Sequence, residues 1–306
     1  MRNAFIDELT ALAKVHPHIA LVVGDLGYSV VEPFADLFPD RFINAGVAEQ
    51  NMTGLAAGMA SEGYHVFTYS IANFPTFRCA EQIRNDVDYH RLPVTIVSVG
   101  GGLAYGSLGY SHHAIQDYAL MRTLPNMLIA APGDPMEVRS CLRYLIDNPG
   151  PAYLRLSKAG EPNIHCAMPE VAPGRWLKLY EGRDHEQALV CTGAGAQVAM
   201  RWHMNVGVGR QERSIFSVPL WSMKTKRLQR DLLNKFKKIT TIEDHLVDGG
   251  FGSWMLEASV LASNGNEALD CRIIPVALDA SVCDTVGSHE LLNTVGGLSS
   301  AALFID

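Results

Sequence analysis

The chain has 306 residues, of which 48% are hydrophobic and 19% are charged, and its formal net charge is −7. This composition is ordinary for globular proteins, so it excludes a disordered tail, a collagen-like repeat and a disulfide-stabilised miniprotein. The negative charge argues against a nucleic-acid partner, and no apolar run approaches the ~20 residues that a membrane-spanning helix needs.

The first residues, MRNAFIDELTALAK, have the pattern of an amphipathic helix and lack the apolar core and cleavage site of a signal peptide. The six cysteines are scattered and form no CxxC pair, so the sequence predicts neither a zinc site nor a redox motif. We interpret them as free, buried, reduced thiols of a cytoplasmic protein.

Apolar, β-branched runs alternate with helix-length segments through the first half of the chain. Such strands predict a parallel sheet that is covered by helices on both faces. Residues 48–62 show the helical period, and Asp134-Pro135 opens another helix with a capping residue followed by proline. The expected strands are 19–26, 41–46, 65–70, 94–100, 127–133 and 152–157.

A change of composition separates this half from the rest. Proline, glycine and charged residues accumulate between about residues 159 and 186, which is typical of an interdomain linker. A second α/β series follows, with expected strands at 188–194, 214–222, 238–245 and 272–278. We therefore predict an α/β protein of two doubly wound domains: a mainly parallel-sheet domain at 1–160, a linker at 161–186 and a smaller domain at 187–306.

Ligands of open parallel sheets bind at the carboxyl ends of the strands. This rule makes candidates of the residues that follow the expected strands. Two glycine-rich segments, VGGGLAYG and TGAGAQVA, are incomplete as dinucleotide fingerprints, so we do not predict nicotinamide binding. The candidate segments are 25–29, 46–50, 70–77, 100–113 and 157–158.

Glu49 lies in the first turn of an expected helix, where the helix dipole favours an acid. Its surroundings, RFINAGVAEQNMTGLAAGMASEGYHVF, resemble the pyrimidine-binding domain of the transketolase family, which includes deoxyxylulose-phosphate synthase. The resemblance runs from about residue 2 to residue 160 and continues more weakly over 188–306. It implies that Glu49 contacts the aminopyrimidine ring of thiamine diphosphate (ThDP) and, by sharing a proton with it, activates the cofactor.

The segment YSIANFPTFRCAEQIRND carries aromatic residues at a helical spacing that is also common in cores. In the family, this stretch supplies the aromatic face against which the pyrimidine packs. The resemblance implies that Phe74 is the main stacking residue, that Phe77 is a second one, and that Ile71 stands where many members carry a third. Asp25 matches a family aspartate near the cofactor pocket and the subunit interface.

The segment SVGGGLAYGSLGYSHHAIQDYALMRTLPNM resembles the glycine-rich loop of the family. It implies that His112 donates a proton or a hydrogen bond to substrate oxygens, with His113 as a neighbour. Two positions depart from standard transketolases: Leu108 replaces an aspartate, and Gly100 replaces a histidine. Both polar sugar contacts are lost, so pyruvate or a deoxy-keto compound becomes an alternative to a sugar-type donor.

Substrate phosphate is the expected ligand of three further residues. Lys158 matches the basic residue that follows the AYLRLS strand in the family, and Arg2 and Ser29 match two other phosphate-side positions. From the pattern alone, each could equally be a solvated surface residue. A lysine would bind phosphate as a point charge, without the fork of an arginine.

The family binds the cofactor diphosphate through Mg²⁺, on a GDG stretch followed by a downstream asparagine, and this sequence contains no such segment. We predict no metal ligands on this chain. The resemblance therefore implies the C-terminal subunit of a split transketolase-like enzyme. A separate N-terminal subunit would bring the diphosphate-binding domain and Mg²⁺, in an α2β2 assembly.

We predict a transferase that moves a two-carbon ketol or acyl unit from a ketone donor to an aldehyde acceptor. The beta subunit of a 2-oxoacid dehydrogenase decarboxylating component and a pyruvate-using, deoxyxylulose-phosphate-synthase-like enzyme remain alternatives. A regulatory homologue with an inactive site is a third, although the retained Glu49, Phe74 and His112 argue against it. The basic residues between 224 and 238 indicate a solvated helix face or a docking surface.

Overall fold

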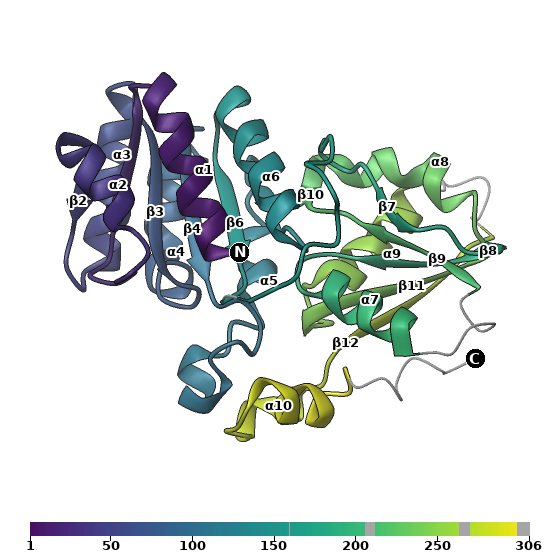
Figure 1. The fold of residues 1–306 in the computed structure, drawn as a ribbon. Coiled ribbons are helices and arrows are strands. Elements are labelled where there is room, and N and C mark those ends of the chain that lie inside the picture. Colours follow the sequence, from purple (N-terminus) through teal and green to yellow (C-terminus); the bar gives the residue numbers. More distant parts are fainter. Residues whose placement is uncertain (159, 206–211, 263–269, 299–306) are drawn as a thin grey trace.

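The computed structural model describes residues 1–158, 160–205, 212–262 and 270–298. Two sheets lie side by side, and helices cover both faces of each (Figure 1). The larger sheet has seven strands in the order β10-β5-β6-β4-β3-β1-β2, of which only β10 is antiparallel to its neighbour. Its strands are β1 (Ile19–Val23), β2 (Phe42–Asn44), β3 (His65–Ile71), β4 (Val94–Val99), β5 (Leu128–Ala130), β6 (Ala152–Leu156) and β10 (Leu220–Trp221).

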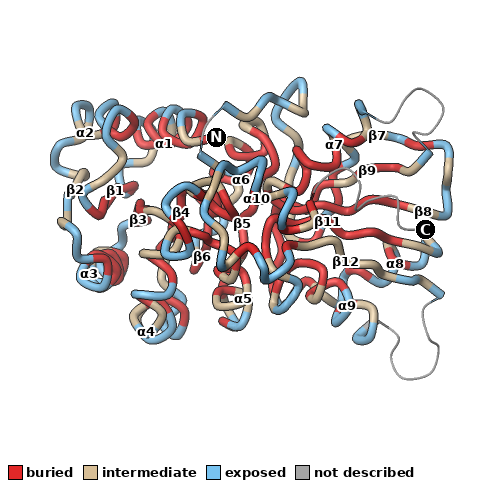
Figure 2. The backbone as a smooth tube through the Cα atoms, turned by 90° about the horizontal axis from the view of Figure 1, so that it is seen from below, coloured by how far each residue is buried: buried red, intermediate tan, exposed pale blue. Residues whose placement is uncertain are grey.

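The central strands of this sheet are buried along their whole length, as expected for a sheet covered on both faces. One group of helices, α1, α2 and α6, covers one face, and α3, α4 and α5 lie on the other (Figure 2). The helices are α1 (Arg2–Val15), α2 (Glu32–Leu37), α3 (Glu49–Ser61), α4 (Ala80–Gln82), α5 (Asp117–Met121) and α6 (Pro135–Asp147), and a π-helical turn, Ile83–Asp88, extends α4.

The smaller sheet has five strands in the order β12-β11-β8-β9-β7, and β7 is antiparallel to β9. Its strands are β7 (Leu177–Tyr180), β8 (Asp184–Cys191), β9 (Arg213–Ser217), β11 (Lys238–Leu246) and β12 (Arg272–Leu278), and its helices are α7 (Gly195–Asn205), α8 (Arg230–Leu233), α9 (Phe251–Ala262) and α10 (His289–Val295). Two mainly parallel α/β sheets confirm the predicted fold class.

The structure differs from the expected elements in two places, and Cys166, which is expected to be buried, is exposed because it lies in the irregular segment between β6 and β7. Residues 177–180 and 184–186, expected in the linker, are strand residues of β7 and β8. The expected strand 214–222 is divided, because Pro219 interrupts it and cannot donate a ladder hydrogen bond. Its first part, β9, stays in the smaller sheet, whereas β10 pairs with β5 of the larger one.

A shared apolar core fixes the two sheets relative to each other. Trp221 of β10 packs against Tyr118 of α5 at 5.3 Å between ring centroids and against Trp254 of α9 at 5.5 Å. All three side chains are fully buried. This buried aromatic cluster therefore packs the larger sheet against the second domain. Among the described residues, no helix has the length and apolar character to cross a membrane.

Candidate active site

Glu49 is a buried carboxylate at the carboxyl edge of the larger sheet. It is the first residue of α3 and is only 2% exposed. A Cβ atom built on Gly24, just after β1, would lie 3.7 Å from Glu49 Cγ and 3.6 Å from the Ser70 hydroxyl at the end of β3. The Ser70 hydroxyl is buried and has no hydrogen-bond partner among the described residues. Glu49 therefore lies between the ends of two neighbouring strands, where a parallel sheet binds ligands.

Arg78 is the partner of this carboxylate. Its Nη1 donates to Glu49 Oε2 at 2.7 Å, and its guanidinium carbon lies 4.8 Å from the centroid of the Phe74 ring. The Arg78 side chain is 48% exposed. No motif in the sequence singles out this arginine, because its contact with Glu49 depends on how the segment after β3 packs on α3.

Phe74 and Phe77 line a cavity of about 470 Å³ beside this ion pair. Phe74 is half-buried, and Phe77 is 50% exposed. Ile71, the last residue of β3, is half-buried and is not part of the cavity lining. The remaining lining residues are Asn73, Arg78, Tyr110, Ser111 and Gln116. The aromatic pair expected from the sequence thus does border an open space.

His112 meets the same aromatic residue from the glycine-rich loop. Its ring lies edge-on to Phe74, with 5.3 Å between centroids, and its Nδ1 lies 3.0 Å from the Ser111 hydroxyl. Burial, with a smaller contribution from the neighbouring His113, lowers the pKa of His112 below its usual value. The side chain of Asn73 donates to the Ser111 and His113 carbonyls at 3.2 and 2.8 Å, which fastens the loop to the Phe74 segment.

His113 and Leu108 lie on the same loop as His112 but differ from it in exposure. His113 is fully buried, and its Nε2 lies 3.4 Å from the Gly106 carbonyl, which is a structural contact within the loop. Leu108 is 55% exposed on the same loop. Lys158 is exposed after β6, and its Nζ lies 5.3 Å from the centroid of the Tyr105 ring.

Asp25 and Ser29 belong to the loop between β1 and α2, and both have positive φ angles, 54° and 63°. Asp25 Oδ1 accepts from the Asn44 side chain at 2.9 Å and from the Tyr28 hydroxyl at 3.0 Å, and these hydrogen bonds hold its pKa below the usual range. The Ser29 backbone N–H donates to Glu32 at 2.7 Å. These bonds stay within the loop, β2 and the start of α2, so they shape the loop and do not join it to the Phe74 cavity.

Arg2, at the start of α1, has a buried Nε atom without a hydrogen-bond partner among the described residues. Its charge acts on the buried hydroxyl of Tyr69, whose pKa is raised to about 12 by burial. Arg78 contacts both Glu49 and Phe74, and the Phe74 ring contacts His112. The His112 ring also lies near Tyr105, whose ring is in turn contacted by Lys158. Arg2, Asp25 and Ser29 lie outside this chain of contacts.

A buried ion network supports the base of the glycine-rich loop, and sequence reasoning did not identify it. Arg155 of β6 donates from Nε to Asp117 at 2.7 Å and from Nη1 to Asp244 of β11 at 2.6 Å. A Cβ atom at Gly101 would lie 2.6 Å from Arg155 Cζ, and one at Gly102 would lie 2.8 Å from Asp244 Cγ. Only glycines admit so close an approach, so the glycine run is the signal in the sequence that points to this contact.

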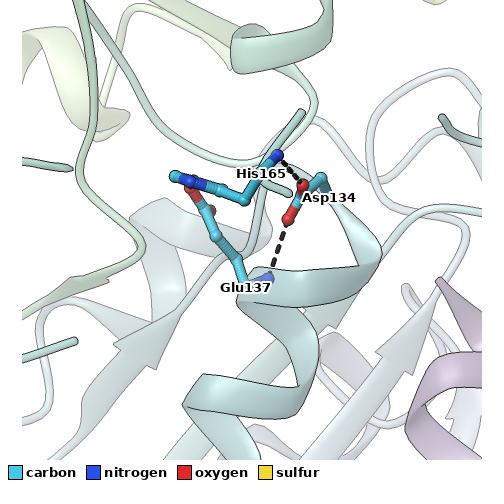
Figure 3. Close-up of side chains that lie close together, drawn as sticks. All are labelled: Asp134, Glu137 and His165. Carbon is cyan, nitrogen blue, oxygen red and sulfur yellow. Dashed lines mark hydrogen bonds and ion pairs between the residues drawn. The ribbon is translucent and has the colours of Figure 1, made fainter. Parts of the chain in front are cut away.

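In the part of the chain that the structure describes, one group of side chains has a spacing that could suit a metal ion: Asp134, Glu137 and His165 (Figure 3). Asp134 caps α6 by accepting from the Glu137 N–H at 2.7 Å, and it also accepts from the His165 N–H at 2.8 Å. Glu137 accepts from His165 Nε2 at 3.0 Å and from the Ser217 hydroxyl at 3.0 Å. Every carboxylate oxygen has a protein donor, so the group fastens residue 165 and β9 to the start of α6.

A family profile described as the pyrimidine-binding domain of transketolase matches residues 1–161, more than half of the chain. The chain belongs to the transketolase family. It is 35% identical over 300 residues to a protein of Methanocaldococcus jannaschii described as a transketolase C-terminal section, covering 97% of this chain and 92% of that protein. One subunit of an apulose-4-phosphate transketolase from Phocaeicola vulgatus is 33% identical over 262 residues, covering 84% and 82%. The resemblance seen in the motifs is confirmed.

Solved structures of transketolases share the fold. A split-gene transketolase, solved as an inactive beta4 tetramer, has a TM-score of 0.82 at 29% identity, with 99% of this chain and 94% of that chain covered. The transketolase of Campylobacter jejuni has a TM-score of 0.77 at 16% identity and is covered over only 45% of its length.

The sequence relatives include longer proteins as well. A deoxyxylulose-phosphate synthase of Clostridium perfringens is 30% identical, and this chain covers 48% of its length. The chain thus spans about half the length of these longer proteins.

Proposed function

We propose that the chain is the C-terminal subunit of a split, ThDP-dependent transketolase-like enzyme. It would transfer a two-carbon unit from a ketone donor to an aldehyde acceptor. The observation that carries this proposal is the group formed by Glu49, Arg78 and Phe74. The Arg78 guanidinium contacts both a buried carboxylate and a half-buried aromatic ring at the edge of the sheet, and this arginine and the ring line an open cavity.

The Arg78 guanidinium shows what this group can bind. It is planar, it donates a hydrogen bond to the carboxylate, and it lies over the Phe74 ring. An aminopyrimidine ring has the same three properties, since it is flat, donates hydrogen bonds and stacks on aromatic faces. The residues present therefore fit the pyrimidine end of ThDP, provided that Arg78 moves aside. When bound, ThDP supplies the nucleophilic carbon that adds to the donor ketone.

The chain's own residues have separate parts in this proposal. Glu49 would hold a proton against the pyrimidine nitrogen, and Phe74 and Phe77 would orient the ring. Burial lowers the pKa of His112, which favours its neutral form, and a neutral imidazole can hydrogen-bond to substrate oxygens or move a proton between them. Lys158 would hold an anionic end of the substrate as a point charge.

The proposal includes a partner chain. The relatives described as a C-terminal section and as a transketolase subunit match this chain over most of their length, and the beta4 tetramer of the split-gene relative is inactive. The sequence has no GDG segment for a metal-held diphosphate. We therefore assign Mg²⁺ and the diphosphate to a separate N-terminal subunit, in an α2β2 assembly.

The first experiment isolates the tagged chain from its native lysate with ThDP and Mg²⁺ present. The proposal expects a co-purifying chain that carries a GDG segment and a downstream asparagine. Isolation of the chain alone, with tight ThDP binding by calorimetry, would contradict the split site.

Activity of the assembled pair is then measured with Glu49→Gln. We expect turnover to fall by about 100-fold or more, since a general acid–base group contributes that much. Glu62→Gln is the matched control, because Glu62 is an exposed acid at the other end of α3. Equal activity of the two variants would remove Glu49 from the mechanism.

A further inference from the structure

The Tyr105 ring occupies the space beside Gly100, at the carboxyl end of β4. A Cβ atom built on Gly100 would clash with Cδ2 and Cε2 of that ring and would lie 3.2 Å from its Cζ. Gly100 also has a φ of +79°, a backbone conformation that favours glycine. The Tyr105 ring therefore fills the volume that a side chain at position 100 would occupy, although Tyr105 lies five residues further along the loop.

The same ring lies between two residues of the proposed substrate site. Its centroid is 6.5 Å from that of His112, at an interplanar angle of 69°. Lys158 Nζ lies 5.3 Å from the centroid of the Tyr105 ring, within the range of a cation–π contact. Tyr105 is half-buried. One side chain thus contacts both the proposed proton-handling residue and the proposed anion-binding residue.

Two positions of this loop offer no polar side chain to a substrate. Gly100 has no side chain, and the exposed Leu108 on the same loop offers no hydrogen-bond donor or acceptor. A substrate hydroxyl that is moved from water onto an aromatic face without a partner loses its hydrogen bonds, whereas a C–H group in the same place loses none.

We propose that Tyr105 is a specificity-determining residue of the substrate site. Its ring forms the wall between His112 and Lys158, and it favours phosphorylated substrates that carry hydrogen instead of a hydroxyl group where they face it. This inference rests on the proposed function, because it takes His112 and Lys158 as substrate residues.

The test uses the assembled two-subunit complex with ThDP and Mg²⁺, with hydroxypyruvate as donor. Two acceptors that differ by one hydroxyl, ribose 5-phosphate and 2-deoxyribose 5-phosphate, are compared by kcat/KM, and their Kd values are measured by calorimetry. The variants are Tyr105→Ala, which removes the ring, and Tyr105→Phe, which removes only its hydroxyl. Tyr89→Ala is the control, since Tyr89 is 77% exposed at the end of the π-helical turn.

We expect the wild type and Tyr105→Phe to prefer the deoxy acceptor by about tenfold, and Tyr105→Ala to lose this preference. Gly100→Ala puts a methyl group where the ring lies; it is strained by the φ of +79°, and the folded variant should show a reduced preference as well. An unchanged preference in a folded, active Tyr105→Ala complex overturns the inference and leaves the proposed function intact. An equal loss in Tyr105→Phe also overturns it, because the hydroxyl would then be the discriminating group.

The two proposals can fail separately. A complex that turns over no donor contradicts the proposed function, but a ratio of Kd values that changes in Tyr105→Ala still supports the role of the ring. If neither sugar phosphate binds to the wild-type complex, both proposals are overturned.

Discussion

The Arg78 guanidinium donates to the Glu49 carboxylate at 2.7 Å, and the two partners differ sharply in exposure: the arginine side chain is 48% exposed and the glutamate 2%. A buried carboxylate without a partner carries a large desolvation cost, and the bond to Arg78 offsets this cost at Glu49. The same bond occupies the contact that we propose for the aminopyrimidine ring. Cofactor binding and the Arg78–Glu49 ion pair are therefore expected to compete.

Arg78→Ala should strengthen ThDP binding to the assembled complex by roughly two- to fivefold, because a half-exposed ion pair contributes up to about 1 kcal/mol. Calorimetric titration of ThDP checks this. Arg84→Ala is the control, since Arg84 lies further along the same segment and its Nη1 donates to the side chain of its neighbour Asn85. Weaker binding in Arg78→Ala would mean that Arg78 stays at the site and holds the cofactor.

Phe74→Ala should weaken ThDP binding by about tenfold, since aromatic stacking contributes roughly 0.5–1.5 kcal/mol beyond burial. Phe74→Leu keeps most of the apolar volume but not the flat face, so it should lose nearly as much affinity while unfolding at the temperature of the wild type. Calorimetry and thermal unfolding separate the two effects. Unchanged affinity in both variants would make Phe74 a core residue alone.

Arg155→Met should lower the free energy of unfolding by about 3–5 kcal/mol, because it leaves two buried carboxylates without their partner. Arg143→Met is a matched control. Its Nε donates to a carboxylate at 2.7 Å, as that of Arg155 does, but its side chain is 53% exposed. We expect less than about 1 kcal/mol there. Urea unfolding of both variants measures the difference, and similar losses would refute the importance of the buried network.

His165 should make stability depend on pH. Burial alone lowers its pKa, but the hydrogen bond and charge of Glu137 outweigh burial, so the pKa in the folded protein is raised above 6.5. A raised folded pKa stabilises the protein fully below the unfolded value, and this contribution is lost as pH rises through the folded value. The thermal midpoint of the wild type should therefore exceed that of His165→Ala most below pH 6.5. If the thermal midpoints of the two proteins changed in parallel with pH, this prediction would be contradicted. His185→Ala, at an exposed histidine, is the control.

The sequence by itself determined the alternation of strands and helices, the parallel sheets and the position of Glu49 at a strand end. These follow from local patterns, because the period of apolar residues and the caps of a helix lie within a few neighbouring residues. The sequence showed the glycine run at 100–102 only as part of a loop that resembles the family's, and the structure shows that Tyr105, Arg155 and Asp244 approach it closely.

Only the tertiary structure decided which residues meet across long stretches of chain. It brought Arg78 to Glu49, turned Tyr105 against Gly100, joined β10 to β5 and set Asp244 beneath the glycine-rich loop. No local pattern predicts these contacts, since each depends on how whole elements pack and on which buried charges find partners. The nature of the proposed substrate wall is therefore a property of packing, whereas its place at the carboxyl edge of the sheet is already a property of the sequence.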